Sequence, residues 1–191
     1  TQKDQPYAEM VFPNPEYRLL ALFRYWNVVN YFFPYKHLIG DSWETVLARY
    51  IPKFEANKDA TDYQLTVREL VTEMRDSHGN VRNANAASEK LGTYLPPVLV
   101  GHIENKSVVT KVLNDKVPIK VGDVVLSVDG EPVEKRREFL ARYTSASTPQ
   151  WLMRSVHFRL LLGPKDSVVK LKVQGTGGEV RDVELTRSQT T

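Results

Sequence analysis

The sequence predicts an α+β protein in which a three-helix unit precedes a β-rich unit. Residues 15–76 contain long stretches that suit helices, whereas from Thr93 onward the apolar residues fall into short, β-branched runs. The stretch between them is rich in Asn, Ala and Ser. We therefore divide the chain into a lead-in (1–14), a helical unit (15–80), a linker (81–92) and a β-rich unit (93–188).

The first helix is expected to begin at Pro15, which suits a first helical turn, and to end near Phe33, before Pro34. Its apolar residues cover nearly the whole circumference, which is typical of a helix buried on most sides. One hypothesis is that part of it packs on a further domain or on a second copy of the chain. The alternative is that its aromatic rings fill a compact three-helix core.

Two capping-box patterns predict the next helices. Asp41-Ser-Trp-Glu44 introduces a helix to about Glu55, which Pro52 kinks or shortens. Thr61-Asp-Tyr-Gln64 introduces a third, whose apolar residues recur at helical spacing and which should end near Asp76.

The β-rich unit is predicted from five short apolar runs, with Gly177–Gly178 as a hairpin turn between the last two. A helical stretch from about Val133 to Leu162 interrupts them and should break around residues 144–149. The five predicted strands are Val98–Ile103, Ser107–Leu113, Val124–Val128, Val168–Val173 and Val180–Leu185.

Composition excludes several classes of function. The net charge is +3, with 26 basic and 23 acidic residues and no long basic run, so a nucleic-acid partner is not expected. Because the chain has no cysteine, it has no disulfide, zinc–thiolate site or cysteine nucleophile. The most apolar segment, Leu19 to Phe33, contains Arg24 and is shorter than a membrane span needs. No signal peptide opens the chain.

No metal or cofactor is expected. His37, His102 and His157 are dispersed and lack the spacing of metal ligands. The glycines between residues 175 and 178 connect two β runs, which suits a hairpin tip rather than a phosphate-binding loop that opens a helix.

The segment Lys120 to Gly130 reads Lys-x-Gly-Asp-x-x-Leu-x-x-Asp-Gly, a buried strand between two turns whose acidic residues, Asp123 and Asp129, serve as turn formers. This order resembles the signature of a PDZ domain of the type attached to bacterial proteases. The resemblance implies a small β-barrel that binds polypeptides by adding them as an extra strand on a sheet edge.

By that resemblance, the strand Val98, Leu99, Val100, Gly101 and His102 forms one wall of a peptide groove. The other wall should come from the helix that begins near Glu134, through Phe139, Leu140 and Tyr143. The alternative is that Val98–Ile103 is a sheet strand without a ligand.

The loop Tyr94-Leu95-Pro96-Pro97 should capture the carboxylate of a polypeptide C-terminus with its backbone N–H groups. However, proline has no N–H, so two donors are missing. Either the loop is displaced from this position or carboxylate capture is weak.

A second motif, Asp76-Ser77-His78-Gly79, lies at the end of the third helix. Taken alone, a histidine there is most simply a helix cap that the helix dipole favours. With the preceding helices and the PDZ-like unit behind it, however, the motif is similar to the front half of tricorn-type, carboxyl-terminal-processing serine peptidases. The resemblance implies that His78 is the general base and that Ser77 lies beside it in the site. The related branch with a serine–lysine dyad lacks this histidine.

No convincing nucleophile motif such as Gly-x-Ser-x-Gly occurs in the chain. We therefore expect the chain to be the substrate-recognition portion of a serine peptidase that cleaves polypeptides, inactive alone because the nucleophile domain is missing. The family implies a periplasmic, outer-envelope or secreted location. The alternative function is a non-enzymatic, PDZ-containing adaptor that binds peptides.

Overall fold

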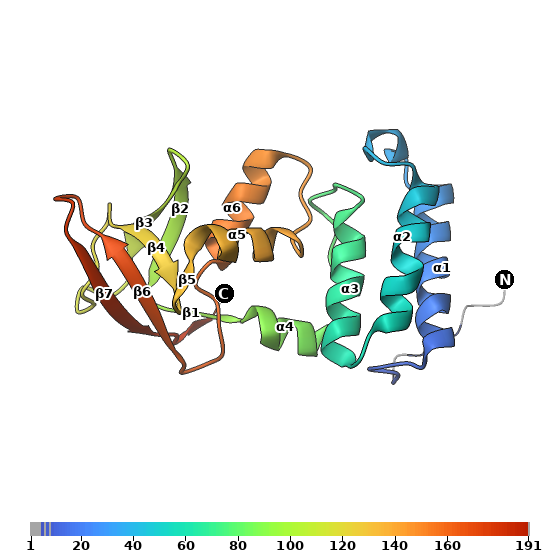
Figure 1. The fold of residues 1–191 in the computed structure, drawn as a ribbon, viewed down its shortest axis with the longest axis horizontal. Coiled ribbons are helices and arrows are strands. Elements are labelled where there is room, and N and C mark those ends of the chain that lie inside the picture. Colours follow the sequence, from blue (N-terminus) through green and yellow to red (C-terminus); the bar gives the residue numbers. More distant parts are fainter. Residues whose placement is uncertain (1–4, 6, 8, 191) are drawn as a thin grey trace.

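The computed structural model describes residues 5, 7 and 9–190, so part of the predicted lead-in lies outside the described residues. The fold is α+β, as predicted, with helices α1 to α3 at one end and an antiparallel sheet at the other (Figure 1). The helices are α1 (Pro15–Phe32), η1 (Lys36–Leu38), α2 (Trp43–Ala56), α3 (Ala60–Thr72), α4 (Asn85–Leu91), α5 (Val133–Ala141) and α6 (Pro149–Arg159). The strands are β1 (Tyr94–Leu95), β2 (Val98–Ile103), β3 (Lys106–Val112), β4 (Val124–Val128), β5 (Glu131–Pro132), β6 (Val168–Gln174), β7 (Val180–Thr186) and β8 (Gln189–Thr190).

The starts of α1, α2 and α3 are set by side-chain caps. The side chain of Asn14 accepts a hydrogen bond from the backbone of α1, as predicted for a helix that begins at Pro15. Ser42, rather than Asp41, caps α2. Asp59, rather than Thr61, caps α3, because its carboxylate accepts the Asp62 N–H at 2.8 Å.

One predicted helix end is confirmed and one is wrong. Helix α2 continues through Pro52 to Ala56, close to the predicted end at about Glu55, so the proline does not shorten it. Helix α3 ends at Thr72, four residues before the predicted end at Asp76. Arg75 in the following segment has a φ of 52°, a left-handed conformation that an α-helix cannot contain.

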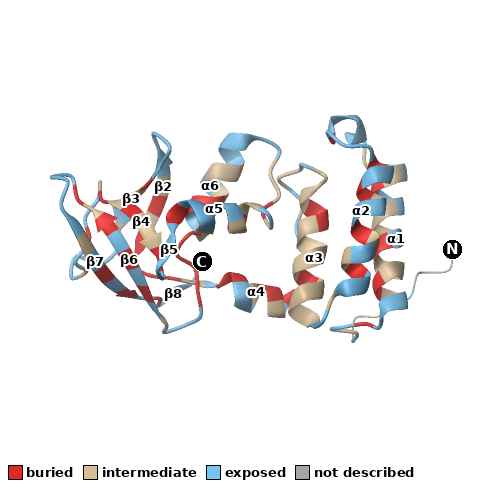
Figure 2. Cartoon of the chain, in the orientation of Figure 1, coloured by how far each residue is buried: buried red, intermediate tan, exposed pale blue. Residues whose placement is uncertain are grey.

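Helices α1 and α2 are joined by a buried arginine and two tryptophans. The guanidinium of Arg18 donates to the carbonyls of Phe54 and Glu55 at 2.8 and 2.9 Å, near the C-terminus of α2, where free carbonyls need donors. The indole N–H groups of Trp26 and Trp43 each donate to the other residue's carbonyl. Buried residues concentrate on the facing sides of the two helices (Figure 2).

The six-stranded sheet has the order β2-β3-β4-β6-β7, with β5 paired to β4, and all its pairings are antiparallel. Its path is open at β2 and β7, whereas the sequence predicted a small β-barrel. The predicted helical stretch is broken as expected, into α5 and α6, which pack on the sheet. The main members of this core are Val109, Val125, Leu171 and Val173 from the strands, with Leu140, Val156 and Leu160 from the helices.

The two predicted turn formers, which flank β4, also bind residues of β6, of β7 and of the segment after β7. Asp129 accepts the Lys170 N–H at 2.9 Å and an Arg187 N–H at 3.1 Å. Asp123 caps its own turn and pairs with Arg181 of β7.

The segment interpreted as a linker contains α4. The Ala87 N–H of this helix donates to the side chain of Gln64 in α3 at 3.1 Å, and Leu91 joins the core of the sheet. The segment is therefore packed against both parts of the chain, and the domain boundaries stay a prediction. In the part of the chain that the structure describes, no helix is long and apolar enough to cross a membrane.

Candidate functional site

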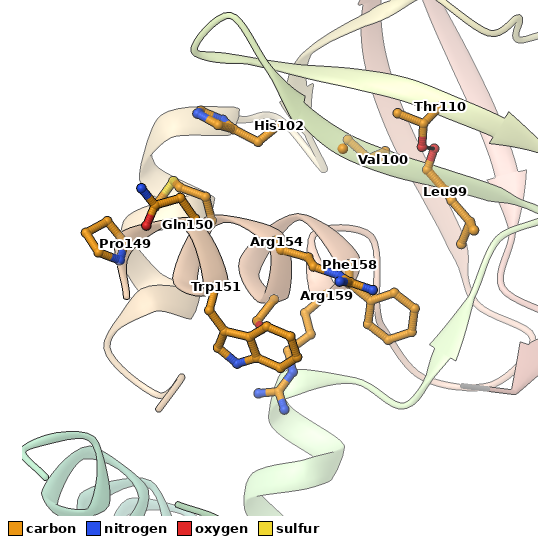
Figure 3. A pocket seen from close by; sticks show the side chains of 13 residues that line it. Leu99, Val100, His102, Thr110, Pro149, Gln150, Trp151, Arg154, Phe158 and Arg159 are labelled. Carbon is orange, nitrogen blue, oxygen red and sulfur yellow. Dashed lines mark hydrogen bonds between the residues drawn. The ribbon is translucent and has the colours of Figure 1, made fainter. Parts of the chain in front are cut away.

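A groove of about 990 Å³ runs between the edge strand β2 and helix α6 (Figure 3). Helix α6 begins here because the Thr148 hydroxyl accepts the Trp151 N–H at 3.2 Å and Pro149 occupies the first turn. The residues that line the groove are Leu99, Val100, Gly101 and His102 of β2, Thr110 of β3, and Pro149, Gln150, Trp151, Met153, Arg154, Ser155, Phe158 and Arg159 of α6.

The backbone of β2 presents hydrogen-bonding groups to this groove. Val109 of β3 donates its N–H to the Asp123 carbonyl, and its own carbonyl accepts the Gly122 N–H. Both bonds lie on the side of β3 that faces away from β2. Val100, its partner across the β2–β3 pair, therefore cannot exchange hydrogen bonds with it. The N–H and C=O of Val100 consequently point toward the free edge of the sheet, where an added strand would pair.

The groove has an apolar wall with a charged rim. Trp151 and Phe158 of α6 are large apolar side chains that are 43% and 46% exposed. The guanidinium of Arg154 lies 5.5 Å from the Trp151 ring centre, a cation–π arrangement. Such a surface offers contacts to the side chains of an extended polypeptide.

A buried histidine fixes α6 against the sheet. His157 donates from Nδ1 to the Met153 carbonyl at 2.7 Å, and its Nε2 lies 3.0 Å from the Ser107 hydroxyl of β3. Because the carbonyl can only accept, Nε2 accepts the hydroxyl proton in the neutral ring. Burial is the main cause that lowers the pKa of His157. The hydrogen bond to the Met153 carbonyl raises this pKa, and the electrostatic effects of His102 and Arg137 lower it further.

The structure corrects the predicted second wall of the groove. That wall is α6, whereas α5, which carries Phe139 and Leu140, packs into the core of the sheet. Leu140 is only 2% exposed and cannot contact a ligand. The ring of Phe139 stacks edge-on against Tyr143, 5.3 Å away, and Tyr143 lines two other cavities.

The loop that was predicted to bind a carboxylate, residues 94–97, uses most of its backbone hydrogen-bonding groups within the chain. The Tyr94 N–H donates to the Gly163 carbonyl at 3.1 Å, and the Leu95 carbonyl accepts the Ser188 N–H. The Val98 N–H donates to the Pro96 carbonyl at 2.7 Å, and Pro97 has no N–H to offer. This loop therefore does not present the row of free donors that the resemblance implied.

His78 lies in a separate cavity of about 230 Å³, between the end of α3 and α6. Its side chain is 95% exposed. The Asp76 carboxylate lies 2.9 Å from Nδ1 and also accepts the His78 N–H at 2.9 Å. Both hydrogen bonds lower the pKa of Asp76, and the one from the His78 backbone N–H has the larger effect. Asp76 is therefore ionised and can only accept, so the proton of this hydrogen bond lies on Nδ1. In the neutral ring, Nε2 is left free to accept a proton.

Ser77 contacts the α5–α6 loop instead of the imidazole. Its N–H donates to the Ser147 hydroxyl at 2.9 Å, and its own hydroxyl accepts the Ser147 N–H at 2.9 Å. Among the described residues, no hydrogen bond joins a serine hydroxyl to His78. The arrangement thus holds a potential base in place but shows no nucleophile for it to activate.

Sequence reasoning missed Asp76 and Ser147 as partners of the predicted pair, and Trp151 and Phe158 as the groove wall. The spacing of Asp76 and His78 was a usable signal, because an aspartate often bonds the backbone two residues on. Ser147 had no such signal, since it lies seventy residues away from Ser77.

The fold is similar to those of known structures. Mature CPAF matches with a TM-score of 0.66 at 16% sequence identity, over 90% of this chain and 34% of the CPAF chain. CPAF complexed with lactacystin matches with a TM-score of 0.61 at 14% identity, over the same shares. The photosystem II D1 C-terminal processing protease matches with a TM-score of 0.42 at 19% identity, over 94% of this chain and 45% of its own.

No protein-family model and no curated protein matches the sequence. CPAF is a tricorn-type serine peptidase, so the resemblance predicted from the sequence is found again in the fold. The chain spans about a third of the length of CPAF. At this level of identity the likeness concerns the fold alone.

Proposed function

We propose that this chain is the polypeptide-recognition portion of a tricorn-type serine peptidase. In this proposal, a three-helix unit (15–80) precedes a PDZ-like unit (93–188), and a substrate polypeptide lies in the groove between β2 and α6. The observation that carries the proposal is the free edge of β2, whose Val100 backbone points away from β3 beside an apolar helix wall.

Binding would proceed by strand addition. The polypeptide backbone pairs with Val100 and, by the alternation of an antiparallel pair, with His102. Its alternate side chains contact Leu99 and Phe158. Backbone pairing supplies affinity for many sequences, and the side-chain contacts supply selectivity.

In the same proposal, His78 is the general base for a serine supplied from outside these residues, and Asp76 orients its ring. This assignment is supported by the free Nε2 and the exposed side chain. Ser77 and Ser147 would position the motif by linking it to the α5–α6 loop.

The proposed partner of α1 is either the peptidase core domain or a second copy of the chain. Tyr31 and Phe32 are 72% and 79% exposed and lie near exposed Val28, Tyr35 and Leu38. An apolar surface of this kind is typical of an interface. By family likeness we also propose a periplasmic, outer-envelope or secreted location.

Strand addition can be tested by modifying the peptide rather than by mutating the protein. A fluorescein-labelled peptide rich in Val and Ala is titrated with the chain, followed by two versions that are N-methylated at alternate residues. If a strand is added, one N-methylated version loses affinity by tenfold or more because it loses hydrogen bonds to β2, while the other binds normally. Equal affinity of all three peptides would refute strand addition.

A groove-filling variant provides the second arm of this test. Ser155→Trp adds a bulky side chain to the groove and should weaken binding. Val180→Trp adds the same side chain at an exposed position on β7, outside the groove, and should bind as the wild type does.

The role of His78 separates a peptidase from an adaptor. In a protein that supplies the nucleophile, His78→Ala should lower turnover by a factor of about 10² to 10⁴ while peptide affinity stays unchanged. In an adaptor the same change is silent.

A further inference from the structure

Arg159, the last residue of α6, lies where the groove meets two smaller cavities. It lines the groove, the His78 cavity of about 230 Å³ and a third cavity of about 200 Å³. In Figure 3 its guanidinium points toward α4, drawn in light green. The third cavity is lined in part by Ser88 and Leu91 of α4, Thr93 and Phe158.

A second arginine borders the same two smaller cavities. Arg68 of α3 lines both smaller cavities, so the two arginines approach from helices that are far apart in the sequence. One Nη of Arg68 donates to the Ser88 hydroxyl at 3.1 Å. Its Nε is buried and has no hydrogen-bond partner in the described part of the chain. The pair therefore keeps unused donors.

Within the described part of the chain, no carboxylate compensates the two positive charges. Among the described residues, neither arginine forms an ion pair, and Glu69, one position along from Arg68, is shared by Lys53 at 3.1 Å and Arg142 at 3.6 Å. Burial lowers the pKa of both arginines, and the charge of Arg159 lowers that of Arg68 further. Two half-buried like charges without a counterion are unfavourable, and an anion between them would relieve the cost.

We propose that Arg68 and Arg159 form a carboxylate-binding site at the C-terminal end of α6, where a polypeptide in the groove places a negative charge. This site deepens the proposed function and rests on it. The carboxylate comes either from the chain end of the polypeptide or from an Asp or Glu side chain. Guanidinium groups suit it because they bind carboxylates through paired hydrogen bonds.

The position of the site explains how an anion could be held without the predicted loop. The 94–97 segment offers few donors, since Tyr94 uses its N–H within the chain and the two prolines have none. Arg159 and Phe158 border both the groove and the third cavity. A polypeptide that passes Phe158 would therefore come next to Arg159, the following residue of α6.

The test compares three labelled peptides of one sequence by fluorescence anisotropy: a free acid, a C-terminal amide, and an amide with one internal Glu. Arg159→Gln is the test variant. Arg154→Gln is the matched control, because Arg154 lies on the same helix and lines the groove but neither smaller cavity. We expect the free acid or the Glu peptide to bind the wild type about tenfold or more tightly than the plain amide.

This preference should disappear in Arg159→Gln and remain in Arg154→Gln. Preference for the free acid identifies a chain end as the source, and preference for the Glu peptide identifies a side chain. Equal binding of all three peptides by the wild type, or an unchanged preference in Arg159→Gln, overturns the proposal.

A separate arm distinguishes failure of the groove from failure of the anion site. Acetate is titrated at constant ionic strength while the arginine Nε–H signals are followed by NMR. If no peptide binds, the proposed function fails, and the acetate result then decides on the anion site alone. A saturable shift of the Arg68 and Arg159 signals supports the site, and its absence refutes it.

Discussion

The buried His157 predicts that the fold is less stable in mild acid. Its imidazole is held neutral between the Met153 carbonyl and the Ser107 hydroxyl, and burial lowers its pKa below the ordinary value of about 6.5. In the unfolded chain the ring takes up a proton near pH 6.5, whereas in the folded chain it resists protonation. The unfolded state therefore binds more protons between these two pKa values, and stability falls as the pH decreases through that window.

The size of the effect follows from linkage. One proton taken up on unfolding changes the free energy of unfolding by at most about 1.4 kcal/mol per pH unit. The loss should begin as the pH drops below about 6.5 and stop once the folded-state pKa is passed. Above pH 7.5 this histidine should contribute no pH dependence.

Urea unfolding of the wild type and of His157→Gln, at steps from pH 7.5 to 5, measures this slope. The amide can still donate to the carbonyl and accept from the hydroxyl, so the variant should fold. It should lack the part of the slope that His157 supplies. The same slope in the wild type and in His157→Gln would refute the reasoning.

Three further predictions concern the frame around the site. Gly92 and Gly130 have φ of 87° and 82°, but only at Gly92 would a Cβ overlap neighbouring backbone. Gly92→Ala should therefore lower the melting temperature clearly more than Gly130→Ala, which should cost about 1 kcal/mol, and equal shifts would contradict this packing. Leu140→Ala should lower the free energy of unfolding, measured by chemical denaturation, by about 2–5 kcal/mol without changing peptide affinity. A loss of affinity would show that Leu140 contributes to the groove after all. Ser77→Ala and Ser147→Ala should show a coupling of about 0.5 kcal/mol or more in a double-mutant cycle, and additive effects would show that their hydrogen bonds do not couple the two segments.

Local patterns allowed most of the fold to be predicted. The runs Val98–Ile103 and Val124–Val128 have the predicted bounds as β2 and β4, because each is an apolar, β-branched run between turn residues. The segment that became α4 was missed. Its Asn, Ala and Ser residues have no apolar periodicity, and it is stabilised by a contact from Gln64 that only the fold reveals.

The wall of the groove could not be predicted for a related reason. Both α5 and α6 follow β4 and both carry aromatic residues, so the sequence does not determine which of them faces β2. Two contacts determine that α6 faces β2. His157 anchors α6 to Ser107 of β3, and Leu140 packs α5 into the core of the sheet. The resemblance pointed to the strand β2 and to His78, whose roles stay predictions, while long-range packing determined the contacts that both make.

The two faces of α6 suggest why recognition and the base would share one chain. Trp151, Ser155 and Arg159 line both the groove and the His78 cavity. The α5–α6 loop is joined to the His78 motif through Ser147, and α6 itself is anchored to the sheet by His157. A polypeptide held in the groove would therefore have a fixed position relative to the imidazole. Because proton transfer requires the base within hydrogen-bonding reach of its partner, such fixed placement is what a recognition unit must supply to a site completed elsewhere.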